Sequence, residues 1–120
     1  MLSPIVYSHF VPERDVRKLE LDNGTVPFDK WLASLRDKRI EAAVDARLAR
    51  VRAGNFGDHK RLGGGVSELR IDVGPGLRVY YGESGRRIVI LLGGGDKKSQ
   101  KRDIVRAQVL WREWLKTKNV

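Results

Sequence analysis

Apolar residues between positions 25 and 53 recur at the spacing of two consecutive helices. In the first stretch they lie three or four residues apart just after Pro27, which predicts a short helix that begins near Thr25. A second apolar stripe runs through residues 38–53 and stops at Gly54-Asn55, while Asp37 before it is either a break or the cap of this second helix. The stripes consist of Phe28, Trp31, Leu32 and Leu35, and of Ile40, Val44, Leu48 and Val51. We expect a helical hairpin whose apolar side faces another layer.

From residue 66 to residue 92, apolar positions alternate with polar ones, as they do in β-strands. Strands are expected at residues 66–73, 77–81 and 87–92, with glycine-containing turns between them. The last of the three is apolar on both faces, which is typical of a central strand. An earlier strand is expected at residues 16–21, before the turn signal Asp22-Asn23-Gly24. The three later strands are predicted to form an antiparallel meander.

A third helix is predicted from Ser99, which can cap it, because the apolar residues that follow share one side of a helix. These are Ile104, Ala107, Trp111, Trp114 and Leu115, with Gln108 among them. The order is strand, helix, helix, three strands, helix (β-α-α-β-β-β-α). This is an α+β layout in which a small antiparallel sheet packs its one apolar face on the helices. The chain of 120 residues has room for one domain, expected at residues 16–120 after an N-terminal extension at residues 1–15.

Charged side chains gather on the second face of the meander. Glu68, Arg70 and Asp72 on one strand, and Arg78 and Tyr80 on the next, are predicted to project the same way. A face covered by helices would not tolerate so many unpaired charges, so this face is expected to be open. Two arginines, a carboxylate and a tyrosine can hold a phosphodiester, stack a base and manage a proton. Cross-strand salt bridges, such as one between Glu68 and Arg78, are the alternative interpretation.

The distribution of charge agrees with a polyanion-binding surface. The chain carries 24 Lys or Arg and 15 Asp or Glu, a formal net charge of +9. Residues 1–58 hold 10 basic and 9 acidic side chains, whereas residues 59–120 hold 14 and 6. A basic face of this kind is typical of proteins that bind nucleic acid, although a solvated surface tuned for solubility explains the charge equally well.

Other site classes receive little support from the sequence. There is no Cys, and His9 and His59 stand far apart, so no metal or other cofactor is expected. His59, beside Lys60, is either a loop residue or a phosphate contact and proton shuttle. The segment from Gly93 to Ser99 departs from phosphate-loop spacing, although Lys97, Lys98 and Gln100 at a helix start could receive one phosphate. No apolar run reaches the ~18 residues of a membrane span, and residues 1–10 lack secretory-signal features, so a cytoplasmic protein is expected.

A series of short blocks in this sequence resembles the HigB-like branch of the RelE/ParE toxin superfamily, the phage-related addiction module killer proteins. The similarity covers about residues 16–115, and the ordered series is more specific than any single block. The blocks are Phe28-x-x-Trp31-Leu32-x-x-Leu35, Gly54-Asn55-Phe56-Gly57-Asp58-x-Lys60, Val66-x-Glu68-Leu69-Arg70-Ile71, Gly74-Pro75-Gly76-x-Arg78-Val79-Tyr80-Tyr81 and Leu91-Leu92-Gly93-Gly94-Gly95-Asp96-Lys97-x-x-Gln100.

The resemblance implies a RelE-like fold and a toxin of a type II toxin–antitoxin system that cuts messenger RNA, in many members on the ribosome. In this chemistry the ribose 2′-hydroxyl attacks the adjacent phosphate without a metal and leaves a 2′,3′-cyclic phosphate. The partner is expected to be a small helix-turn-helix antitoxin, and operator DNA is expected to be bound only through the complex with it. The family's basic positions match Arg70, Arg78 and Lys97.

The chain departs from several relatives in its C-terminal segment, where they carry a Tyr or His and this chain reads Gln100-Lys101-Arg102-Asp103. Glu68, Tyr80, His59 and Lys60 are therefore the candidates for proton transfer, and Tyr80 is also expected to stack a base. Two other functions remain open at this point. One is inhibition of DNA gyrase, as in the ParE branch, and the other is non-catalytic nucleic-acid binding.

Overall fold

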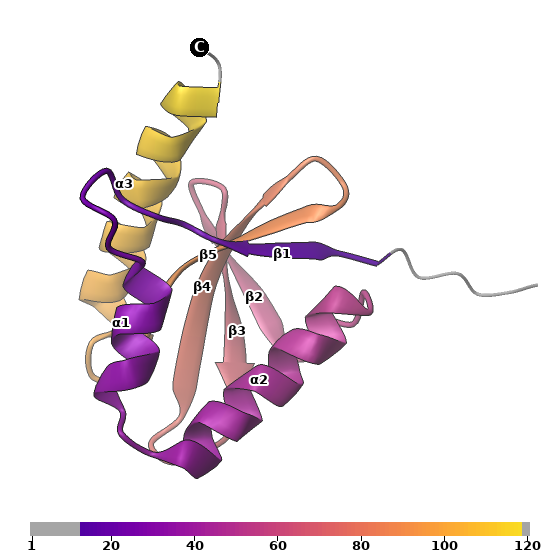
Figure 1. The fold of residues 1–120 in the computed structure, drawn as a ribbon, viewed down its shortest axis with the longest axis vertical. Coiled ribbons are helices and arrows are strands. Elements are labelled where there is room, and N and C mark those ends of the chain that lie inside the picture. Colours follow the sequence, from indigo (N-terminus) through magenta and orange to yellow (C-terminus); the bar gives the residue numbers. More distant parts are fainter. Residues whose placement is uncertain (1–12, 119–120) are drawn as a thin grey trace, which may run out of the picture.

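The computed structural model describes residues 13–118, which form one five-stranded sheet and three helices. The elements are β1 (Asp15–Lys18), α1 (Pro27–Ser34), α2 (Lys38–Arg52), β2 (His59–Gly63), β3 (Val66–Ile71), β4 (Leu77–Ser84), β5 (Ile88–Asp96) and α3 (Gln100–Lys118) (Figure 1). The expected α+β class is confirmed. Most of the extension predicted at residues 1–15, including His9, lies outside the described residues, although β1 already begins at Asp15.

The sheet has the strand order β1-β5-β4-β3-β2, and it is mixed where an antiparallel sheet was expected. β1 runs parallel to β5, while the other three pairs of neighbours are antiparallel. The strand β2 was missed by the sequence analysis. Its residues lie on a sheet edge and are almost all exposed, so they lack the apolar alternation that marks a half-buried strand.

Helices cover both faces of the sheet, which corrects the prediction that they all pack on one face. α1 and α2 lie in front of the strands in Figure 1, and their buried side chains pack on Leu69, Val79 and Leu91 of the sheet. α3 packs on the opposite face, where Ala107 and Trp111 meet strand residues such as Ile90. The apolar stripe predicted for α3 is confirmed, but its partner is the face that was expected to be open.

Two glycines allow the helices to approach the strands closely. A Cβ atom at Gly94 would overlap the indole of Trp31 from α1, and a Cβ atom at Gly82 would overlap the indole of Trp111 from α3. Each indole therefore rests on bare strand backbone, which only glycine permits. β5 accordingly continues through its glycines to Asp96, beyond the end predicted at residue 92.

Two polar side chains of the α2 region hold this helix in place, one at its N-terminus and one where it faces the sheet. The Asp37 carboxylate accepts hydrogen bonds from the backbone N–H groups of Arg39 and Ile40, so Asp37 is the cap of this helix. Arg47 donates to the backbone carbonyls of Phe56, Asp58 and Arg70 at 2.6–3.3 Å. It thereby ties α2 to the loop before β2 and to the end of β3.

Within the described residues, no helix is long and apolar enough to cross a membrane.

Candidate functional site

The strand register places Arg70 of β3 directly opposite Arg78 of β4. Glu68 lies two residues before Arg70 and pairs with Tyr80 in the same way. Because alternate residues of a strand point to the same face, all four side chains lie on the face that carries α3. The prediction that these residues share one face is confirmed.

Glu68 is the centre of a buried polar cluster. Its side chain is 2% exposed, and its carboxylate oxygens lie 3.5 Å from Nε of Arg70 and 3.7 Å from Nε of Arg78. The side-chain amide of Gln100, in the first turn of α3, donates to both oxygens at 3.1 and 3.3 Å. A buried carboxylate needs such partners, because leaving a charge unpaired away from water costs several kcal/mol. We call Glu68, Arg70, Arg78 and Gln100 the arginine cluster.

The two arginines differ in exposure. The Arg70 side chain is 39% exposed, whereas that of Arg78 is 11% exposed and donates from Nη1 to the carbonyl of Gly76 at 3.2 Å. The side chains of Lys97 and Arg78 both lie beside Gly76. A Cβ atom built on Gly76 would lie 3.3 Å from Cε of Lys97 and 3.6 Å from Nη1 of Arg78. Two cations therefore share one carboxylate, and a third lies beside Gly76 and Arg78. Their excess positive charge suits the binding of an anion, and the planar guanidinium groups suit phosphate.

The face that carries this cluster is only partly open, which corrects the sequence prediction. α3 covers much of it, and Tyr80 is 1% exposed, so its ring is not available to stack a base at the surface. Burial also raises the pKa of the Tyr80 hydroxyl, with Asp103 and Glu68 nearby adding to the shift. This hydroxyl has no hydrogen-bond partner within the described residues. Asp72 lies beyond the end of β3 and is exposed.

The structure separates Lys60 from His59. On the edge strand β2, Lys60 pairs with Glu68 and lies on the face of the arginine cluster. His59 pairs with Leu69, whose side chain belongs to the core under α1 and α2, so His59 points to the opposite face. Its Nδ1 lies 2.8 Å from the carbonyl of Gly57. Lys60 remains a candidate contact for an anion, and His59 does not join the cluster.

The turn before α3 uses its own side chains to satisfy its backbone. The Asp96 carboxylate accepts from the N–H groups of Lys98 and Ser99, and the Ser99 hydroxyl donates to the Asp103 carboxylate. These two N–H groups at the helix start are therefore occupied and do not face a phosphate. Gln100 is likewise engaged with Glu68, so in this turn only the exposed Lys97 and Lys98 remain available to an anion.

A second group of side chains, which was not predicted from the sequence, lies on the β5 side of α3. Trp31, Tyr80 and Arg106 line a hollow there, over Gly93 and Gly94. Successive glycines inside a strand signal close approach by another group, and this was the available clue. Among residues 13–118, no three His, Cys, Asp or Glu side chains converge as they would around a metal ion.

Comparisons with known proteins give one informative result. No family model matches the chain, and no solved structure matches it. The chain is 47% identical over 89 residues to an uncharacterized protein of Haemophilus influenzae, a match that spans 74% of this chain and 90% of that protein. The chain therefore belongs to the same family as this Haemophilus influenzae protein.

Proposed function

We propose that the protein is the toxin of a type II toxin–antitoxin system, with a RelE-like fold, and that it cleaves messenger RNA on the ribosome in the cytoplasm. The observation that carries the proposal is the pairing of Arg70 with Arg78 across two strands, held by the shared carboxylate of Glu68. The resemblance of the sequence blocks to HigB-like toxins implies the reaction. The paired arginines offer a binding site for the phosphate of the RNA.

The arginines would bind the scissile phosphate and stabilise its transition state. As the 2′-oxygen bonds to phosphorus and the bond to the 5′-oxygen breaks, negative charge increases on the two non-bridging oxygens. Preformed donors at this position act where charge develops and need no reorganisation. Arg70 has the more exposed side chain, and Arg78 is held by Gly76 and Glu68. We assign phosphate binding to both.

Glu68 was a candidate for proton transfer on sequence grounds, and we assign it a different role. A general base must reach the 2′-hydroxyl, but this carboxylate is 2% exposed and already has three partners. We assign it the positioning of both arginines, through which it would act on the reaction. Lys97, beside Gly76, and Lys60, which pairs with Glu68 on β2, are exposed and titratable, and they are our candidates for proton transfer to and from the ribose oxygens.

The proposed partner is a small helix-turn-helix antitoxin encoded next to this chain. Its complex with the toxin would bind operator DNA. The net charge of +9 favours rapid association with an acidic segment of such a partner. Co-expression of the adjacent reading frame should restore growth and give a complex that co-purifies.

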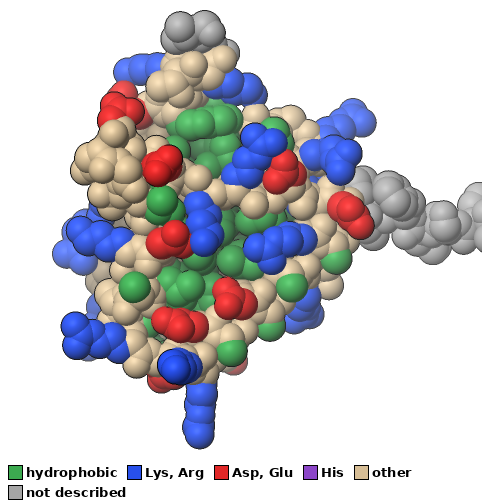
Figure 2. All heavy atoms as spheres, in the orientation of Figure 1, with side chains coloured by type: hydrophobic (Ala, Val, Ile, Leu, Met, Phe, Trp, Pro, Cys, Tyr) green, Lys and Arg blue, Asp and Glu red, His purple; other side chains and the backbone are tan. Residues whose placement is uncertain are grey.

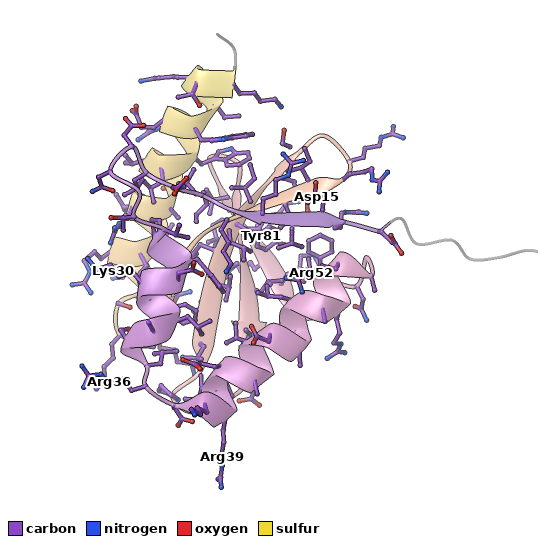
Figure 3. All side chains as sticks on the ribbon, viewed as in Figure 1. Asp15, Lys30, Arg36, Arg39, Arg52 and Tyr81 are labelled. Atoms are coloured by element: carbon purple, nitrogen blue, oxygen red, sulfur yellow. The ribbon has the colours of Figure 1, made fainter. Side chains whose placement is uncertain are left out.

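Induced expression in bacteria tests the proposed activity. We expect growth arrest together with new messenger cleavages in primer extension, and we expect Arg78→Ala to remove both. A matched control is Arg39→Ala, because Arg39 projects from the start of α2 away from the rest of the molecule (Figure 3). Growth arrest with intact messages and loss of DNA supercoiling would instead indicate a gyrase inhibitor. Harmless expression would indicate a non-catalytic binding protein.

A further inference from the structure

A groove follows the outer edge of β5 between α1 and α3. β1 pairs with β5 only as far as Leu91, so the edge beyond that residue has no neighbouring strand in the sheet. Trp31 of α1 lines one wall, Arg106 of α3 lines the other, and Gly93 and Gly94 form the floor. The inner hollow has a volume of about 250 Å³, and it continues along Gly94–Asp96 as a wider depression. We call this feature the β5 edge groove.

The groove presents backbone N–H and C=O groups at its floor and the indole of Trp31 at one wall. Glycines leave the strand backbone bare, and every second residue of an unpaired strand edge directs its N–H and C=O outward. The indole of Trp31 rests on Gly94 and is only partly buried. A planar ring with donors and acceptors on its edge fits such a surface, because it can lie against the indole and bond to the backbone.

The Tyr80 hydroxyl is an independent sign that a ligand belongs here. Tyr80 lines the groove and is 1% exposed, and its hydroxyl oxygen has no hydrogen-bond partner in residues 13–118. Buried hydroxyls nearly always have a partner, so an unpaired one calls for an explanation. A ligand group in the hollow would supply the missing bond.

The rim of the groove is positively charged. Lys30 and Arg106 border the inner hollow, and Figure 3 shows Lys30 on the flank of α1 nearer to α3. Lys98 and Arg102 border the continuation. Within the described part of the chain, none of these four side chains has an ion pair or a hydrogen bond. The acidic side chains of the lining, Asp37, Asp96 and Asp103, all accept bonds from capped N–H groups or from Ser99.

Figure 2 shows a mixture of basic and acidic side chains on the face formed by α1, α2 and β1, with apolar side chains between them. The groove lining is also mixed, with four cations against three carboxylates, so it carries an excess of one positive charge.

We propose that the β5 edge groove binds a nucleotide, with the base against Trp31 and the Gly93-Gly94 backbone and the phosphate between Lys30 and Arg106. An extended peptide could also pair with the free strand edge, but it would leave the Tyr80 hydroxyl and the cationic rim unexplained. The proposal involves neither Arg70 nor Arg78, so it stands whether or not the arginine cluster cleaves RNA.

Titration of the ¹⁵N-labelled full chain with AMP, GMP, CMP and UMP tests the proposal. At least one of the four nucleotides should shift the amide resonances of Gly93 and Gly94 and the indole N–H of Trp31. Ribose 5-phosphate should bind more weakly, because it lacks the base. Arg106→Ala should weaken nucleotide binding about tenfold, the usual effect of removing a charge-assisted hydrogen bond.

The matched control is Arg112→Ala, which removes another exposed arginine of α3 that lies outside the groove, and it should leave the affinity unchanged. Tyr80→Phe keeps the ring and should weaken binding without loss of folding. Failure of all four nucleotides to shift these resonances would overturn the proposal. Equal binding of ribose 5-phosphate, or equal weakening by Arg112→Ala, would do the same. Shifts caused only by a synthetic peptide of alternating Glu and Val would assign the edge to strand pairing instead.

Discussion

The side-chain amide of Gln100 donates to the carboxylate of Glu68 at 3.1 Å and so joins the first turn of α3 to the middle of β3. The two residues are 32 positions apart in the sequence. Through this contact the start of α3 closes over the arginine cluster, and one buried carboxylate holds a strand arginine on each of two neighbouring strands. The geometry of the proposed phosphate site therefore depends on the helix as much as on the sheet.

Removal of the Glu68 carboxylate should destabilise the fold. Glu68→Ala leaves Arg78, which is mostly buried, without its acidic partner, and we expect the free energy of unfolding to fall by about 3–5 kcal/mol. Urea denaturation followed by circular dichroism measures this change. Asp72→Ala is the control, because Asp72 is exposed and should cost little. Equal stability of the two variants would show that the cluster contributes nothing to folding.

Arg70→Ala and Arg78→Ala should lose toxicity while remaining folded. Loss of one transition-state donor typically lowers a rate by about 10²-fold or more. Growth assays and circular dichroism on each variant give the two readouts. Leu69→Ala is the comparison for a purely structural effect, since its fully buried side chain should cost about 2–5 kcal/mol when truncated. If a folded Arg78→Ala protein arrests growth as strongly as wild type, the arginine cluster is not the catalytic site.

Two adjacent tyrosines should respond differently to loss of their hydroxyls. The Tyr81 hydroxyl has a hydrogen bond with Ser67, whereas that of Tyr80 is buried without a partner among residues 13–118. Tyr81→Phe should therefore lower the free energy of unfolding by about 1 kcal/mol, and Tyr80→Phe should leave it unchanged or raise it. Chemical denaturation of both variants under one set of conditions makes the comparison. A larger loss for Tyr80→Phe would mean that its hydroxyl is already satisfied in the free protein.

The protein should lose stability in alkaline solution. Burial raises the pKa of Tyr81 to about 12, and it also raises that of Tyr80. Above the unfolded value of about 10, the unfolded chain releases phenolic protons that the folded protein still holds, so the free energy of unfolding falls as pH rises. Denaturation between about pH 9 and pH 11 tests this, and Tyr81→Phe should show a shallower decline than wild type. Parallel declines would exclude Tyr81 as a cause.

Much of the local structure follows from the sequence alone. Apolar residues at helical spacing identified all three helices, and strand alternation identified β3, β4 and the start of β5. The same alternation placed Glu68, Arg70, Arg78 and Tyr80 on one face, as the register confirms. These results are obtainable because periodicity and capping depend on residues within a few positions of one another.

Only the tertiary structure decided how these elements assemble. From the sequence, the charged face was expected to remain uncovered because unpaired charges cannot be buried. In the structure, Glu68 pairs with Gln100, Arg70 and Arg78, and these contacts make burial under α3 possible. The parallel pairing of β1 leaves the end of β5 free and so creates the groove beside Trp31. Both outcomes come from contacts between residues far apart in the chain, and no local pattern encodes which helix will cover which face or where a sheet edge will remain open.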